Sequence, residues 1–206
     1  MKDLLLITPP FTQLNTPYPA TAYIKGFLKT KSITAFQMDL GIEVILELFS
    51  KKGLTAIFEH PVPSTQHPNL HRIYSLRQDY INTIDSVIEF LQGKNRTLAR
   101  QICAGNFLPE ASRFEQLDDM EWAFGSMGMQ DKAKHLATLY LEDLSDFIKE
   151  AVDENFGFSR YAERLGRSAN SFDEMYSHLQ KDLTYIDAIA LQILEEKLKQ
   201  DRKSVV

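Results

Sequence analysis

The sequence predicts a helix-dominated α/β protein: a partial doubly wound unit with a small parallel sheet, followed by a large helical insertion. Residues 4–7 form an unbroken aliphatic run, which is typical of a strand buried on both faces of a parallel sheet. The first 50 residues then alternate strand-like and helix-like patterns, as at the start of a doubly wound fold. From about residue 70 onward, helical periodicity dominates the chain.

The opening unit, β-α-β-α in order, is predicted over residues 1–58. Its first strand ends at the Pro9-Pro10 pair, because proline cannot donate a hydrogen bond to a neighbouring strand. Pro19 suits the first position of a helix over residues 20–31. A second strand is expected within residues 32–40, and a buried helix follows over 42–50. The apolar face of the first helix is expected to comprise Ala20, Tyr23, Ile24, Phe27 and Leu28.

Residues 59–72 are predicted to form a proline-rich linker, because they contain three prolines and show no hydrophobic periodicity. Residues 73–182 are predicted to form the helical insertion. Gly93 and Gly105 are expected to follow the ends of its first two helices. The helices themselves are expected over residues 73–91, 97–104, 131–155, 161–165 and 171–179.

Residues 183–206 are predicted to form a returning helix and the start of a third strand. Thr184 with Asp187 has the spacing of a reciprocal helix cap. Beyond the charged end of this helix, Ser204-Val205-Val206 brings two β-branched residues, which favour strands. We interpret this ending as a truncated third strand, with a frayed tail as the alternative.

The composition excludes some partners and favours one compartment. The 206 residues carry a formal net charge of −5, which argues against nucleic acid because phosphate binding usually requires a basic face. No run approaches the roughly 18 apolar residues of a membrane span, so no membrane partner is expected. The single cysteine, Cys103, lies in an apolar helical context. It predicts a buried thiol in a reducing, cytoplasmic compartment.

The loop after the first strand is a candidate ligand site, because ligands of doubly wound folds bind at the carboxyl ends of the strands. Residues 8–19 contain four prolines, whose stiffness would hold polar side chains in place for a neutral, partly flat ligand. The alternative is a rigid connection into the helix. The predicted cofactor-binding residues of this loop are Thr12, Gln13, Asn15 and Tyr18.

Asp39 and Gly41, after the second strand, complete the predicted cofactor-binding set. An acid at this position often accepts a hydrogen bond from a ligand hydroxyl, whereas capping of the next helix is the alternative role for Asp39. No Gly-x-Gly-x-x-Gly follows the first strand, so a pyrophosphate-bound dinucleotide is not expected. No catalytic or metal-ligating residue is predicted, and the acidic pair Glu142-Asp143 is interpreted as part of a solvated face.

Three segments of the opening unit, residues 5–19, 23–28 and 37–43, resemble the N-terminal, cobalamin-binding-like domain of radical S-adenosylmethionine proteins of the Fe-S oxidoreductase type. In that family the first strand ends in a Pro-Pro loop, here Pro9-Pro10. A Tyr-Pro pair, here Tyr18-Pro19, leads into the helix, and the second strand ends in an acidic residue, here Asp39. The resemblance covers about a quarter of the chain and implies a Rossmann-like fold.

The resemblance also implies a function. The radical core of the family requires Cys-x3-Cys-x2-Cys to hold a 4Fe-4S cluster, and Cys103 alone cannot supply it. The cluster and S-adenosylmethionine are therefore expected in a missing C-terminal core, which is the expected partner. Cobalamin is the implied cofactor, although Asp-x-His-x-x-Gly is absent. The chain would be a non-catalytic front domain that shapes the cobalamin or substrate side of the active site.

Two other classes of function stay open from the sequence. The helical region could form a protein- or peptide-interaction module, in which case its partner would be a peptide substrate or another protein. Alternatively, the whole chain could act as a stand-alone sensor that binds a small molecule. A metal site is not expected in either case, because the five histidines do not form a ligand pattern.

Overall fold

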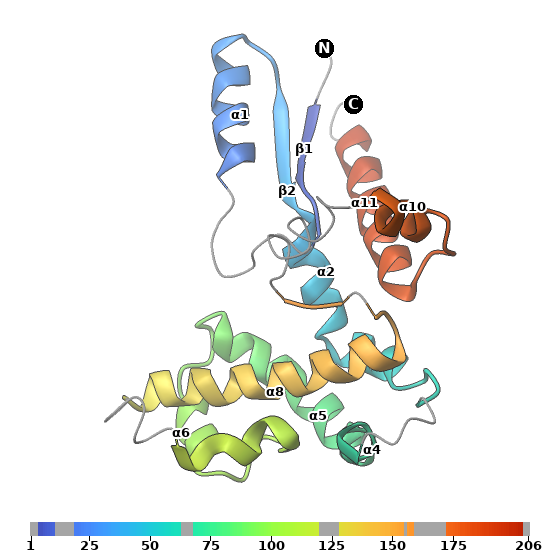
Figure 1. The fold of residues 1–206 in the computed structure, drawn as a ribbon. Coiled ribbons are helices and arrows are strands. Elements are labelled where there is room, and N and C mark those ends of the chain that lie inside the picture. The colour runs from blue at the N-terminus through green and yellow to red at the C-terminus, as the bar shows by residue number, and fades with distance from the viewer. Residues whose placement is uncertain are drawn as a thin grey trace. The chain divides into compact units, whose positions relative to one another are not determined.

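The computed structural model describes residues 4–10, 19–62, 68–119, 128–154, 156–158 and 172–203. It confirms a helix-dominated α/β protein with a small parallel sheet (Figure 1). The chain divides into two compact units. The first combines Met1–Ile45 with Gly157–Val206, and the second is Leu46–Phe156. The second unit therefore interrupts the sequence of the first.

The first unit is built on a β-α-β arrangement. Strands β1 and β2 pair in parallel, with Leu4 opposite Ala35 at one end and Thr8 opposite Asp39 at the other. Helix α2 begins at Leu40, directly after β2, and continues across the boundary between the units. The elements of this unit are β1 (Leu4–Thr8), α1 (Ala20–Thr30), β2 (Ala35–Asp39), α2 (Leu40–Leu48), α10 (Phe172–Leu179) and α11 (Tyr185–Lys203).

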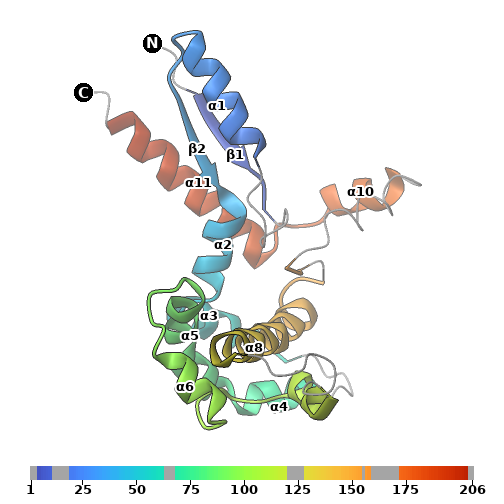
Figure 2. The ribbon, with the colours of Figure 1, turned by 90° about the vertical axis from the view of Figure 1, so that its left-hand side faces the viewer.

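Helices α1 and α11 lie on opposite sides of the two strands (Figures 1 and 2). Helix α1 contacts both strands. Helix α11 begins with the predicted reciprocal cap, in which the Asp187 backbone N–H donates to Thr184 Oγ1 at 3.2 Å and the Thr184 N–H donates to Asp187 Oδ2 at 2.9 Å. The predicted third strand at residues 204–206 and the predicted helix at 161–165 lie outside the described residues.

The apolar face predicted for α1 is present in the sequence but is not buried. Tyr23 is 78% exposed, Phe27 61% and Ile24 47%, and no residue of α1 is classed as buried. The described part of the sheet has two strands, and these offer too little surface to cover one face of an eleven-residue helix.

The second unit is entirely helical in its described part. The 23-residue helix α8 packs against α4, α5, α6 and η1. Its apolar side forms the centre of the core with Tyr140, Leu144 and Phe147, each of which is fully buried. The elements are α3 (Lys51–Ile57), α4 (Pro68–Ser75), α5 (Arg77–Leu91), α6 (Leu98–Cys103), the 3-10 helix η1 (Ser112–Asp119) and α8 (Met129–Ala151).

The structure corrects two predictions in this unit. Helix α4 begins at Pro68, inside the predicted linker 59–72, because proline is compatible with the first turn of a helix, where its missing N–H is not needed. The single helix predicted over 73–91 is two helices that meet at Leu76. The Ser75 hydroxyl donates to the Arg72 carbonyl at 2.7 Å, a local bond of a kind that bends helices.

Glycines end two helices of the second unit as predicted. Gly93 follows α5 with φ 76° and Gly105 follows α6 with φ 79°, the left-handed region in which glycine carries no steric penalty. At the start of α3, the Ser50 hydroxyl accepts a hydrogen bond from the Gly53 N–H at 3.0 Å and so caps the helix.

Candidate functional site

The carboxyl edge of the two-stranded sheet is the first candidate site. Thr8 and Asp39 are register partners at this edge, so the segments that follow β1 and β2 leave the sheet from the same edge. Thr8 is only 2% exposed, Asp39 is half-buried, and Gly41 is buried in the first turn of α2. The predicted site residues Thr12, Gln13, Asn15 and Tyr18 lie outside the described residues.

Asp39 has a structural role at the start of α2. Its Oδ1 accepts a hydrogen bond from the Ile42 N–H at 3.0 Å, so it caps α2, as the alternative interpretation predicts. A capping carboxylate that uses Oδ1 in this way still has a second oxygen available for hydrogen bonding. The role of Asp39 and Gly41 in ligand binding remains a prediction.

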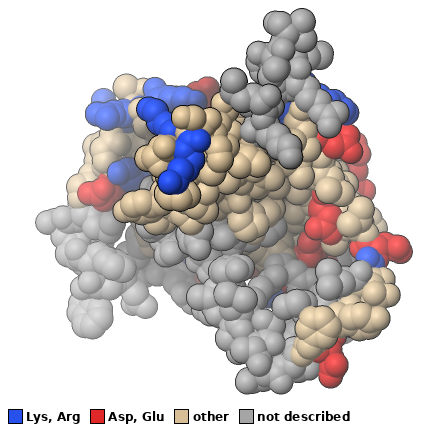
Figure 3. All heavy atoms as spheres, turned by 90° about the horizontal axis from the view of Figure 1, so that it is seen from above, with Lys and Arg blue, Asp and Glu red and all other residues tan. Residues whose placement is uncertain are grey.

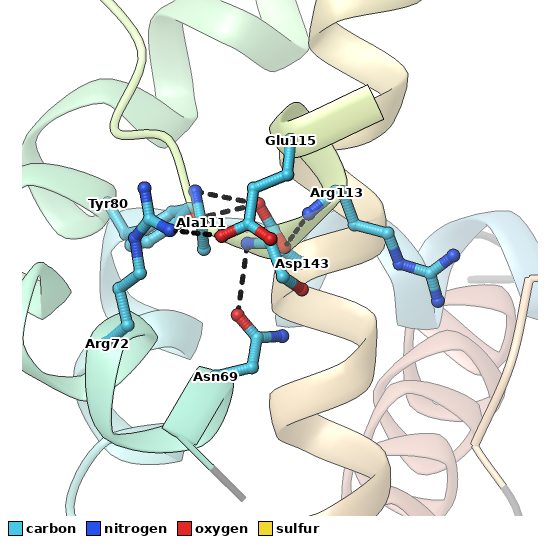
Figure 4. A network of polar contacts seen from close by, with 8 residues as sticks. Asn69, Arg72, Tyr80, Ala111, Arg113, Glu115 and Asp143 are labelled. Carbon is cyan, nitrogen blue, oxygen red and sulfur yellow. Dashed lines mark hydrogen bonds and ion pairs between the residues drawn. The ribbon is translucent and has the colours of Figure 1, made fainter. Parts of the chain in front are cut away.

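A second, buried polar cluster lies in the helical unit and centres on Asp143 of α8 (Figure 4). The Asp143 side chain is fully buried. Its Oδ2 accepts from the Ala111 N–H at 3.2 Å and its Oδ1 accepts from the Arg113 N–H at 3.2 Å. The Tyr80 hydroxyl of α5 donates to Oδ2 at 3.5 Å. The Asp143 carboxyl group of α8 thus forms hydrogen bonds both with the start of η1 and with Tyr80 of α5.

Burial changes the acid–base behaviour of this cluster. Desolvation raises the pKa of Asp143 to about 6. The hydrogen bonds from the two backbone N–H groups act in the opposite direction and lower this pKa. Desolvation also raises the pKa of Tyr80, with the charge of Asp143 as the second cause. The pKa of Tyr140, whose hydroxyl donates to the Tyr80 carbonyl at 3.0 Å, is raised by burial as well. Both tyrosines are therefore neutral hydrogen-bond donors at neutral pH.

Charged pairs surround the buried cluster at the surface. The Arg113 guanidinium binds Asp146 through Nε and Nη2, each at 2.8 Å. Its Nη1 lies 3.6 Å from Glu142 Oε2, and these pairs raise the pKa of Arg113. Arg72 of α4 pairs with Glu115 of η1 at 2.7 Å (Figure 4). These ion pairs hold η1 against α8 and α4, so we assign them a role in stabilising the fold.

The sequence interpretation of Glu142-Asp143 as a solvated face is wrong for Asp143, which is 0% exposed. A signal for its burial was present in the sequence. Asp143 follows Tyr140 by three residues and precedes Phe147 by four, so it shares the apolar face of α8. Aspartate on such a face is buried only when hydrogen bonds satisfy it, and the donors come from a segment distant in the sequence.

The remaining polar and metal-ligating groups of the described residues form no third candidate site. A shallow pocket lies beside α3, lined by both acidic and basic side chains, among them Lys51, Glu59 and Asp85. The Cys103 thiol is half-buried, less buried than predicted, because it lies at the end of α6, where it donates to the Met129 carbonyl at 3.4 Å. Within the described residues, no group of three or more His, Cys, Asp and Glu side chains is placed to hold a metal ion.

The fold defines the class of this protein as helix-dominated α/β. The described part has a parallel sheet of two strands in the first unit, and the helical second unit lies between the two sequence segments of that first unit. No described helix combines the length and apolar character that crossing a membrane requires. Comparison of the chain with protein-family models, with curated proteins and with solved structures finds no match.

Proposed function

We propose that this chain is the non-catalytic front domain of a radical S-adenosylmethionine protein, and that the carboxyl edge of its sheet shapes the cobalamin or substrate side of an active site. A partner core would hold the 4Fe-4S cluster and S-adenosylmethionine. The proposal extends the coarse α/β fold to a doubly wound, cobalamin-binding-like unit in a cytoplasmic protein. The partner core would complete that unit.

The observation that carries the proposal is the parallel pairing of β1 and β2 with Thr8 opposite Asp39. In the sequence the proline-rich segment 11–18 comes after β1, while Asp39 is the last residue of β2 and Gly41 lies two residues further on. In α/β sheets, segments that leave parallel strands at one edge form the ligand crevice. The predicted ligand residues Thr12, Gln13, Asn15 and Tyr18 belong to the first of these two segments.

Titration of the purified full chain with hydroxocobalamin tests the cofactor part of the proposal. We expect saturable binding, followed by calorimetry and by a change in the visible spectrum of the corrin. Asp39→Asn should weaken this binding about tenfold, because a hydrogen bond to a charged acceptor is lost. Asparagine is itself a good helix cap, so α2 should stay folded in this variant.

Asp187→Asn is the matched control, because Asp187 also takes part in a helix cap, that of α11. It should leave cobalamin binding unchanged. Absence of saturable binding to the wild-type chain would contradict the cofactor role. The partner core is tested separately by sequencing the gene beyond codon 206: a Cys-x3-Cys-x2-Cys motif in frame supports it, and an immediate stop codon contradicts it.

A helical interaction module is the second candidate function. The observation that favours it is that Leu46–Phe156 forms a compact unit with its own core, which a sheet-completing role does not require. Deleting this unit and joining its ends with a short glycine-serine linker tests the idea. Loss of cobalamin binding would count against a separable module, whereas retained binding would support one.

A further inference from the structure

Strand β1 has the chemistry of an interior strand. Its sequence from Leu4 to Thr8 has no charge, proline or glycine, although natural edge strands are usually protected by such residues. Its unbroken aliphatic run is typical of strands with a neighbour on each side. Strand β2, in contrast, includes Gln37 and Asp39. Within the described residues, however, β1 has a paired strand on one edge only.

The free edge of β1 can be assigned to particular backbone groups. The Leu4 N–H donates to the Thr34 carbonyl at 3.1 Å, towards β2. Because successive residues of a strand point their backbone groups to opposite sides, Leu6 and Thr8 also point towards β2. The N–H and C=O groups of Leu5 and Ile7 then point away from β2, to the free edge.

Apolar surface lies uncovered on the helix that packs over these strands. Helix α1 contacts both strands, yet Tyr23, Ile24 and Phe27 are 78%, 47% and 61% exposed. A wider sheet would extend the surface on which α1 packs. Exposed aromatic side chains of this kind are enriched among the residues that contribute most to protein interfaces.

The charge around this surface indicates the chemistry of its partner. The described residues 4–10 and 19–38 contain Lys25, Lys29 and Lys31 and no acidic residue, although the whole chain has a net charge of −5. In Figure 3, lysine and arginine side chains gather at the upper left of the face seen from above, and others lie at its right-hand side beside acidic side chains. Electrostatic complementarity therefore favours a partner segment with acidic residues beside its apolar strand.

A second copy of the chain fits this edge less well. Strand β1 has five residues, whereas a stable interface uses about 20–30 residues on each side. Two β1 edges related by a two-fold axis would also pair antiparallel, while unbroken aliphatic strands are characteristic of parallel sheets. A larger partner that covers Tyr23 and Phe27 in addition to the edge would provide enough interface area and could add its strand in the parallel direction.

We infer that the free edge of β1 is a docking site for a parallel, apolar strand of a partner polypeptide, flanked by acidic residues and bound through the backbone groups of Leu5 and Ile7. The inference deepens the proposed function, on which it rests, because it names the strand edge through which a partner core would complete the sheet. It is independent of cobalamin, since the proposed ligand edge lies at the carboxyl ends of the strands.

Hydrogen exchange followed by NMR on the full chain tests the free edge. In the purified protein, the amides of Leu5 and Ile7 should exchange at least tenfold faster than those of Leu6 and Thr8, which face β2. The probe for docking is a synthetic peptide with a five-residue Val/Ile core and two glutamates at each end. Adding it should slow exchange at Leu5 and Ile7 at least tenfold, and the same peptide with a central proline should not.

The direction of the added strand is read from a spin label at the carboxyl end of the probe peptide. In a parallel complex the label should broaden the signals near Thr8 more than those near Leu4. Leu5→Pro, which removes a donor at the free edge only, should abolish protection by the peptide and keep the β1–β2 pairing. Because the exchange comparison on the wild-type chain requires no variant, failure of Leu5→Pro to fold would leave the test intact.

Three results would overturn the inference. The first is that the backbone amides of Leu5 and Ile7 are already protected from exchange in the monomer. The second is that the probe peptide does not slow their exchange at saturating concentration. Protection that rises with protein concentration, together with a dimer in sedimentation, would show that a second copy occupies the edge. A positive cobalamin titration with a negative peptide result would refute strand docking alone, and the reverse pattern would refute the ligand site alone.

Discussion

Replacing Asp143 with asparagine tests whether the helical unit holds a buried carboxyl group at a free-energy cost. Asparagine has nearly the same shape but no charge, and it keeps one carbonyl acceptor. One of the two backbone N–H groups, of Ala111 or of Arg113, therefore loses its acceptor. That loss should cost about 1–3 kcal/mol at every pH. Removal of the charge acts in the opposite direction and depends on pH.

The direction of the pH dependence follows from the pKa of Asp143. Its value in the folded protein is about 6, above the ordinary aspartate value of 3.8, so the folded state binds the proton more tightly than the unfolded state. This contribution to stability is complete below pH 3.8 and is lost as the pH rises through 6. The whole contribution is about 3 kcal/mol, and about 1 kcal/mol of it is lost between pH 5 and pH 7.

Urea unfolding of wild type and Asp143→Asn at pH 5, 6 and 7 measures this contribution. The free energy of unfolding of wild type, minus that of the variant, should fall by about 1 kcal/mol from pH 5 to pH 7. Taking the difference removes groups that titrate alike in both proteins. Glu150→Gln is the control, because it removes an exposed carboxylate from the same helix.

The charged and titratable neighbours of Asp143 define what would refute this reasoning. Tyr80 faces it from α5, Arg113 from η1 and Asp146 from its own helix. If the cationic and backbone donors outweighed desolvation, the pKa of Asp143 would lie below 3.8. The measured difference would then rise with pH or stay constant. Either result would show that the carboxylate is stabilised in its charged form.

Three further substitutions probe the packing of the helical unit. Gly53→Ala should lower the free energy of unfolding by about 1–3 kcal/mol, because its Cβ would contact the backbone carbonyl oxygen of Glu47; an unchanged urea midpoint would contradict this. Leu144→Ala, at a fully buried position, should cost about 2–5 kcal/mol in the same assay, and a loss below 1 kcal/mol would contradict complete packing. In a double-mutant cycle, Arg113→Ala and Asp146→Ala should show a coupling of about 1 kcal/mol or less, since the pair is partly exposed; a coupling well above that would indicate a buried pair.

Local sequence patterns were sufficient for most of the described secondary structure. The aliphatic run at residues 4–7 predicted β1, and its parallel pairing with β2 is confirmed. Gly93, Gly105 and the Thr184–Asp187 pair marked helix ends correctly because these signals act within one helical turn. The errors arose where the same residue type has two roles. Pro68 both suggested a linker and suits the first turn of α4.

Burial was harder to predict than secondary structure, because it depends on residues distant in the sequence. The apolar periodicity of α1 predicted a buried face, but burial also requires a surface to pack against, and a two-stranded sheet provides little. Asp143 shows the opposite case. Its charge predicted exposure, while the donors that permit its burial come from residues 111 and 113, about 30 positions earlier in the sequence.

The candidate ligand edge was predicted from topology, and the structure supports its framework only in part. The pairing of Thr8 with Asp39 brings the carboxyl ends of the two strands to one edge, and the capping bond of Asp39 explains why an acid suits this position. Topology of this kind follows from strand order and direction alone. The positions of side chains in a proline-rich segment depend instead on contacts that sequence periodicity does not encode.

The two units differ in how completely they bury their apolar residues, and this difference bears on function. In the helical unit, Leu54, Tyr80 and Leu144 belong to a core with 0% exposure at each of these positions. In the described part of the first unit, the aliphatic strand β1 is paired along one edge only, and α1 exposes two aromatic residues. Uncovered apolar surface costs free energy that a partner can recover on binding. The helical unit therefore has a buried core of its own, whereas the first unit exposes apolar surface that the partner strand inferred above would cover.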